Sequence, residues 1–138
     1  MRRCWFALPL LATAPRAAHA EGPGLSARLD CTRAAVPGRI VCELTANASS
    51  GKLVWVDALV VQAPPFARPL RSRVVARLDS TGAASAKLAL VASEVGTGKL
   101  RLSVRGVLCH EGAGGEWCGP ELAVVSALIE VGQGAVPP

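Results

Sequence analysis

Aromatic residues are scarce in this chain. It contains no tyrosine, and phenylalanine, tryptophan and tyrosine together make up 4% of its 138 residues. Aromatic side chains are the platforms on which many proteins stack nucleobases. Beyond position 20 the only aromatic residues are Trp55, Phe66 and Trp117. Stacking surfaces for bases or sugars therefore have few residues from which they could be built.

Long apolar runs are also missing. The apolar stretch at residues 5–14 is about half of the roughly 20 residues that a membrane-spanning helix needs. Arg2 and Arg3 precede it, and the small–x–small sequence Ala18-His19-Ala20 follows it, which is the order of a cleavable secretory signal peptide. We therefore predict a signal peptide at residues 1–20 and a single mature domain at residues 21–138. The mature chain is expected to have no stable membrane span and to be periplasmic or secreted.

The mature chain has little excess charge. The whole chain carries 15 basic and 10 acidic residues, a net charge of +5. Removing residues 1–20 takes away three basic residues and no acids, which leaves 12 against 10 and a net charge of +2. A strongly basic domain would have indicated a nucleic-acid partner. We expect no nucleic acid to bind here.

Four cysteines remain once the predicted signal peptide, which contains Cys4, is set aside. They are Cys31, Cys42, Cys109 and Cys118. An even number of cysteines in an exported protein indicates disulfides, here two of them.

The side-chain parity of the strands favours one of the three possible pairings. Cys31 and Cys42 share the apolar face of two successive strands, whereas Cys109, counted onward from Val104, falls with the outward-facing positions. We predict bridges from Cys31 to Cys42 and from Cys109 to Cys118, both structural. The alternative bridge from Cys42 to Cys109 requires a β-bulge, for which Gly106 is the best position.

Apolar residues recur mainly with period two, and glycine or proline turns separate the segments. This pattern predicts an all-β antiparallel sandwich of about seven strands. The expected strands are residues 25–31, 40–44, 53–61, 73–78, 87–92, 100–104 and 121–131. Residues 83–92 taken alone also fit a helix, and the segment after Cys109 is expected to be a glycine-rich loop.

The layout resembles an immunoglobulin-like sandwich. Trp55 follows Cys42 by 13 residues, and Cys109 lies near the end of the sixth expected strand. That fold places its inter-sheet cysteines and its core tryptophan at such positions. The resemblance implies the sandwich architecture and a core position for Trp55. Val107 stands where the fold's tyrosine corner would be.

A second, local resemblance covers the C-terminal quarter. Residues 104–109, followed by a glycine-rich segment and residues 118–121, are similar to the redox-loop region of the N-terminal domain of the DsbD thiol:disulfide interchange proteins. That periplasmic domain passes electrons through a cysteine pair between its last strands. The resemblance implies that Cys109 and Cys118 form a redox-active pair.

Candidate chemistry is confined to Cys109, His110 and Glu111 together with Cys118. His110 is the only histidine of the mature chain, so a Ser-His-Asp arrangement has no independent base. The two cysteines and His110 are soft-metal ligand types, but their spacing is not that of a zinc site. We expect no metal and no cofactor.

Other polar positions have simpler interpretations. Asp57 and Glu43, the acids available for glycoside chemistry, are predicted to be solvated strand positions. A basic stretch includes three arginines of one parity, which could meet an anionic partner or protect a solvated edge. The stretch is formed by Arg68, Arg71, Arg73 and Arg77.

These observations predict an exported, non-catalytic module with a binding or structural accessory role and a protein partner in the cell envelope. Its binding loop is expected to carry His110, Glu111 and Trp117. The alternative is a thiol-disulfide electron-transfer domain that uses Cys109 and Cys118.

Overall fold

The computed structural model describes residues 18–21 and 24–132. Within these residues the regular secondary structure consists of β-strands alone. The strands are β1 (Ala18–Glu21), β2 (Leu25–Cys31), β3 (Gly38–Ala48), β4 (Lys52–Gln62), β5 (Ala67–Pro69), β6 (Arg73–Val75), β7 (Arg77–Leu78), β8 (Ala84–Ala92), β9 (Gly96–Gly112) and β10 (Gly115–Val131).

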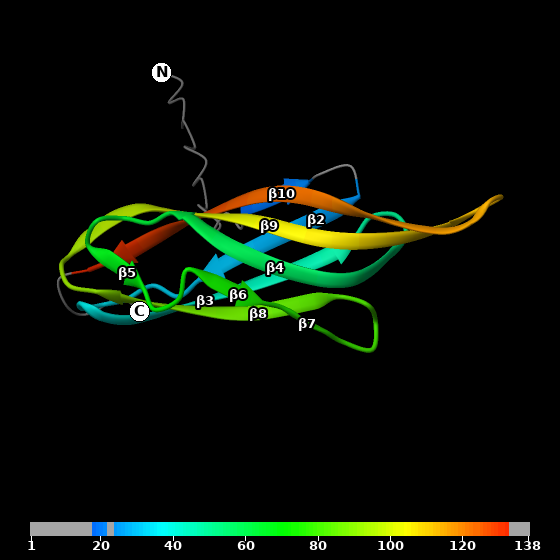
Figure 1. Cartoon of the computed structure of the whole chain (residues 1–138). Coiled ribbons are helices and arrows are strands. Elements are labelled where there is room, and N and C mark those ends of the chain that lie inside the picture. Colours follow the sequence, from blue (N-terminus) through cyan, green and yellow to red (C-terminus); the bar gives the residue numbers. More distant parts are fainter. Residues whose placement is uncertain (1–17, 22–23, 133–138) are drawn as a thin grey trace, which may run out of the picture.

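The strands form two sheets that pack face to face (Figure 1). One sheet has the order β1-β2-β3-β8-β5, with β7 also paired to β8, and the other has the order β10-β9-β4-β6. All strand pairs are antiparallel. The chain changes sheet between β3 and β4, at each step from β4 to β7, and again between β8 and β9. The predicted all-β antiparallel sandwich is therefore confirmed, and its strand order is compatible with an immunoglobulin-like sandwich.

Period-two alternation builds the core between the sheets. Along β9, Leu100, Leu102, Val104, Gly106 and Leu108 are buried, whereas the odd-numbered residues that alternate with them lie on the outer face of their sheet. Alternation of this kind places every second side chain of a strand in the core. The largest fully buried side chains elsewhere are Leu25, Leu29, Ile40, Leu44, Leu90, Ile129, Val56 and Val125.

Both predicted disulfides are confirmed. Cys31 lies directly opposite Cys42 in the β2–β3 ladder, and Cys109 lies opposite Cys118 in the β9–β10 ladder, with Cα–Cα distances of 4.0 Å in both pairs. The alternative bridge from Cys42 to Cys109 is wrong. The β9–β10 register continues without a shift past Gly106, so no bulge turns Cys109 inward.

The glycine-rich segment after Cys109 is not a loop, and this expectation is wrong. β9 and β10 remain paired as far as Gly112 and Gly115, which leaves only Ala113-Gly114 as the turn. Gly115 has a φ of 103°, a conformation that favours glycine. The glycines that suggested a loop serve a tight hairpin turn.

Two expectations about individual strands also change. The single strand expected at residues 73–78 is divided at Ala76, where the chain leaves β4 and joins β8 as β7. Residues 84–92 form strand β8, so the helical alternative is wrong. Leu88, Leu90 and Ala92 are buried at intervals of two, which only an extended chain allows.

Trp55 is not in the core. The register of β4 against β9 shifts by one residue between Leu53 and Trp55, so Val54 forms a β-bulge. Leu53 and Val56 face the core on either side of it, and Trp55 is left 37% exposed on the outer face. One extra residue in the strand therefore reverses the parity that had placed Trp55 inside.

The predicted signal peptide lies mainly outside the described residues. Of residues 1–20 only 18–20 are described, and they belong to β1, which pairs with β2. The predicted cleavage position after Ala20 falls inside this strand. Among the described residues there is no helix with the length and apolar character needed to cross a membrane.

The Cys31–Cys42 bridge closes a short loop between two core strands. We expect the double variant Cys31→Ala/Cys42→Ala to lose about 3 kcal/mol in the free energy of unfolding, because the bridge restricts the unfolded chain. Guanidinium unfolding of the oxidised protein at neutral pH measures this loss. A change below about 1 kcal/mol would contradict a stabilising role for the bridge.

Candidate functional site

The β9–β10 hairpin extends beyond the rest of the sandwich (Figure 1). Side chains on its successive cross-strand pairs alternate between the two faces of the sheet. The disulfide pair lies on the outer face, His110 and Trp117 form the next pair on the opposite face, and Glu111 and Glu116 follow on the outer face again. The residues predicted for the binding loop are thus brought together at one end of the molecule, on strands rather than on a loop.

His110 and Trp117 stack on one another at the base of this extension. Their ring centroids are 4.5 Å apart with an interplanar angle of 22°, and Trp117 is 60% exposed. His110 also lies against Gly51 in the β3–β4 turn, where an added Cβ would be 2.6 Å from His110 Cε1. Gly51 has a φ of 74°, a backbone conformation that favours glycine, and the His110 ring leaves no room for a side chain at this position. These contacts hold the hairpin against the sandwich.

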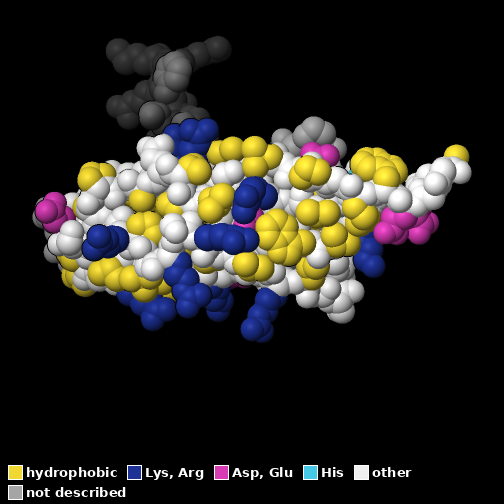
Figure 2. Space-filling model, viewed as in Figure 1, with side chains coloured by type: hydrophobic (Ala, Val, Ile, Leu, Met, Phe, Trp, Pro, Cys, Tyr) yellow, Lys and Arg dark blue, Asp and Glu magenta, His cyan; other side chains and the backbone are white. Residues whose placement is uncertain are grey.

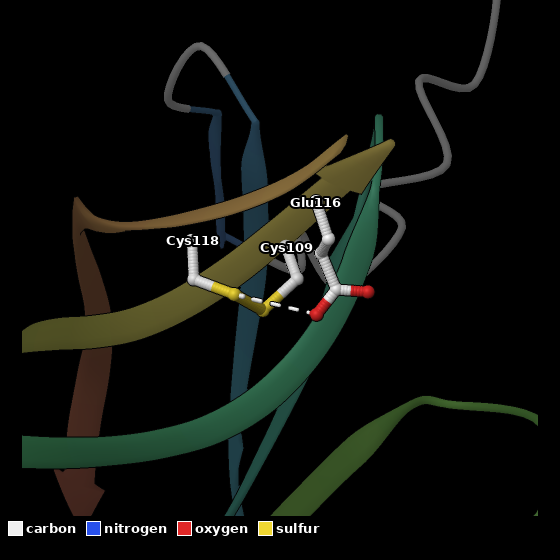
Figure 3. A group of neighbouring side chains, drawn as sticks. All are labelled: Cys109, Glu116 and Cys118. Atoms are coloured by element: carbon white, nitrogen blue, oxygen red, sulfur yellow. Dashed lines mark hydrogen bonds between the residues drawn. A yellow bond between two sulfur atoms is a disulfide. The ribbon is translucent and has the colours of Figure 1, made fainter. Parts of the chain in front are cut away.

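The Cys109–Cys118 disulfide has an acidic neighbour. Cys109 is 8% exposed while Cys118 is exposed, and the Glu116 Oε1 atom lies 3.8 Å from Cys118 Sγ (Figure 3). A carboxylate beside a sulfur disfavours the thiolate through like-charge repulsion. His110 projects from the opposite face of β9, so its imidazole does not compensate for this repulsion.

The metal-ligand set considered from the sequence is not assembled. Cys109, His110 and Cys118 are divided between the two faces of the hairpin. Ligand atoms of Cys109, Glu116 and Cys118 do lie within 4.8 Å of one another (Figure 3). While the disulfide is closed, neither sulfur is the thiolate that a soft metal requires.

A second cluster on the same outer face surrounds Asp57. Its side chain is fully buried even though it points away from the core, because two arginines cover it. Arg105 donates from Nε at 2.8 Å and from Nη2 at 2.5 Å, and Arg73 donates from Nε at 2.6 Å. Both guanidinium groups lie 5.9 Å from the centre of the Trp55 ring, within cation–π range.

The hydrogen bonds from Arg105 hold the pKa of Asp57 below its ordinary value. Burial acts in the opposite direction, and the hydrogen bond from Arg73 adds to the lowering. Asp57 is therefore ionised at neutral pH, and the three groups together carry one net positive charge. The expectation that Asp57 is a solvated strand position is wrong, whereas Glu43 is exposed as expected.

Sequence reasoning missed this cluster, although one signal was present. Asp57 is the only charged residue in the apolar run of residues 53–61. A lone acid in such a run suggests a fixed ionic partner, since an unpaired buried charge is costly. The partners were not identifiable, because Arg73 and Arg105 lie in other strands and the bulge at Val54 decides the face on which they meet Asp57.

Apolar side chains surround this cluster on the outer face of the β10-β9-β4-β6 sheet. Figure 2 shows hydrophobic side chains over the region where Figure 1 places β4 and β9, interrupted by lysine and arginine side chains. The large exposed apolar residues of this sheet include Val54 and Trp55 of β4, Val75 of β6, and Leu122, Val124 and Leu128 of β10. The face combines exposed apolar area with positive charge.

Comparison of the chain with family models, with curated proteins and with solved structures found no match. Neither the immunoglobulin family nor the DsbD family is therefore supported beyond the architecture that the strands display.

We expect the Asp57 cluster to give the protein an acid-sensitive stability. Because the pKa of Asp57 is lowered by folding, its contribution is complete above about pH 4 and is lost as the pH falls through the folded-state value. Asp57→Asn should lower the free energy of unfolding at pH 7 by about 1–3 kcal/mol, less than for a fully buried pair because both arginines are half exposed. Urea unfolding at pH 7 and at pH 2.5 measures both effects.

A matched control is Asp30→Asn, which breaks the exposed Arg28–Asp30 pair on β2. It should change the free energy of unfolding by less than about 1 kcal/mol. Equal losses in the two variants at pH 7, or the same loss for Asp57→Asn at both pH values, would contradict the role given to Asp57.

Proposed function

We propose that the chain is an exported, non-catalytic binding module that contacts a protein of the cell envelope through the end of its β9–β10 hairpin. The observation that carries this proposal is the exposed, stacked Trp117 next to the hairpin's disulfide. Large aromatic side chains held in one conformation are frequent anchors of protein interfaces, because little side-chain entropy is lost when they bind.

The disulfide supports this proposal by fixing the hairpin. Two strands without a core beneath them are marginally stable in water. Residues 111–118 are exposed throughout, so the end of the hairpin has no core to hold it. The Cys109–Cys118 bridge and the stack of His110 on Trp117 replace that missing support. A rigid projection with an aromatic side chain is suited to insertion into a complementary surface.

Export is supported by the order of charge, apolar run and small residues at positions 1–20 and by the two disulfides. Disulfides persist in oxidising compartments. Cleavage after Ala20 would remove all of β1 except Glu21 and leave β2 as the edge of its sheet.

Thiol-disulfide electron transfer is the second candidate function. The exposure of Cys118 on a cross-strand disulfide favours it, because an exchange partner can reach that sulfur. Two observations oppose it. The carboxylate of Glu116 beside Cys118 disfavours a thiolate there, and His110 lies on the opposite face of the hairpin, where its imidazole cannot stabilise one. A structural bridge is the better-supported role.

Site-specific photo-cross-linking in producing cells tests the binding proposal. A photoreactive residue in place of Glu111, exposed at the end of the hairpin, should yield a discrete protein adduct, and Trp117→Ala should reduce the yield of that adduct severalfold because it removes the aromatic anchor. The same photoreactive residue in place of Arg39, exposed on the other sheet, should give no adduct. The recovered chain should have the mass of residues 21–138.

Equal adduct yields at positions 111 and 39, no adduct at either, or an unchanged yield in Trp117→Ala would count against the hairpin as the binding element. Recovery of the full-length chain from the cytosol would count against export. Each arm therefore tests a separate part of the proposal.

The reduction potential of the Cys109–Cys118 pair separates the two candidate functions. A structural bridge should have a potential below about −300 mV, beyond the reach of cellular thiols. Equilibration with dithiothreitol and glutathione buffers, read by mass after thiol alkylation, gives the value for each disulfide. A value near that of thiol oxidoreductases, roughly −120 to −270 mV, would favour electron transfer instead.

A further inference from the structure

A groove of about 580 Å³ lies between β6 and the adjoining part of β8. β7 pairs with β8 only at Ala84 and Ser85, and β5 pairs with it only from Leu90 onwards. Between these two short strands, one edge of β8 carries no paired strand within the described ranges, and β6 of the other sheet faces it. The groove thus exists because β5 and β7 together do not cover the whole of β8.

The groove concentrates positive charge. Arg71, Arg73, Arg77 and Lys87 line it, with Glu43 as the only acid among its lining residues. This is a net charge of +3 in one groove, compared with +2 for residues 21–138 as a whole. Figure 2 shows lysine and arginine side chains gathered along the edge where Figure 1 places β6, β7 and β8.

Most of these cations have no ionic partner. Among the described residues, Arg71, Arg77 and Lys87 have no carboxylate within 4.0 Å, and Glu43 forms no ion pair with any of them. Unpaired cations converging on a concave site create a positive potential that attracts an anion.

Arg73 is the exception, because its ion pair with Asp57 fixes the orientation of its guanidinium group. Its Nε donates to the buried Asp57 at 2.6 Å, while its Nη atoms make no hydrogen bond within residues 24–132. A guanidinium held through Nε keeps its remaining donors in a fixed orientation, so less conformational entropy is lost when an anion binds. Asp57 therefore orients one of the cations that line the groove.

The rest of the lining is partly apolar. Val74, Val75 and Ala86 lie among the cations. The volume falls within the range of small-molecule sites, roughly 300–1,000 Å³. We propose that this groove binds a small organic anion whose charged group is a phosphate, sulfonate or carboxylate and whose body is apolar. This site is separate from the hairpin end and goes beyond the proposed function.

A simpler role for the same arginines is protection of the uncovered edge of β8 against pairing with another chain. That role requires charge alone. It explains neither the anchoring of Arg73 by Asp57 nor the apolar lining residues. The two roles predict different ligand selectivity, which an experiment can measure.

Fluorescence titration of the oxidised protein with anilinonaphthalene sulfonate tests the proposal, since this probe joins a sulfonate to an apolar body. The native protein should bind it saturably, and affinity should fall as salt is added. Arg71→Gln/Arg77→Gln should weaken binding about tenfold, because two charge-assisted contacts are lost. Lys87→Gln, a single change at an exposed position, should weaken it severalfold.

Two controls make the result specific. Arg101→Gln removes an exposed cation of β9 outside the groove, and Trp117→Ala alters the hairpin end; both should leave the affinity unchanged. The neutral probe N-phenylnaphthylamine, which lacks the sulfonate, should bind about tenfold more weakly than the anionic probe. Circular dichroism confirms that each variant is folded.

Several results would overturn the proposal. They are absence of saturable binding to the native protein, unchanged affinity in the double variant and in Lys87→Gln, an equal loss in Arg101→Gln, and equal affinity for the neutral probe. Loss of binding in Trp117→Ala alone would move the probe site to the hairpin and leave the groove without a ligand.

Discussion

Every second side chain along the central part of β9 is buried in the core, and this alternation determines where both candidate clusters lie. This strand pairs with β4 on one side and with β10 on the other. Its even-numbered residues from Leu100 to Leu108 fill the core, so its odd-numbered residues must lie on the outer face. Arg105 is thereby placed against Asp57, and Cys109 is placed opposite Cys118. Both candidate clusters follow from the burial of one row of apolar side chains.

The same alternation explains how much could be predicted from the sequence. Period two is visible in the residues themselves, and it was sufficient for the all-β class and for the pairing of the cysteines. Cys31 and Cys42 share the core-facing parity of their strands, while Cys109 has the outward parity. These assignments needed only local counting within unbroken strands.

The remaining features depend on contacts that no local pattern encodes. A β-bulge at Val54 reverses parity in β4, so Trp55 lies on the outer face instead of in the core, and Asp57 lies on that face beneath two arginines instead of in solvent. The change of sheet at Ala76 and the short β5 and β7 leave the basic groove open, and these depend on how two sheets meet. Glycines near Gly115 suggested a loop because they disfavour strands, yet pairing that begins in the core continues through them.

Both disulfides join cysteines that are neighbours in the order of the chain, with sequence separations of 11 and 9 residues. A chain that emerges amino-terminus first presents Cys31 and Cys42 together, well before Cys109 appears. Beyond residue 20, each of the two then has only the other as a partner. The order of emergence therefore selects the native bond between them. Oxidation that keeps pace with emergence needs no later reshuffling of disulfides, a step that takes seconds to hours.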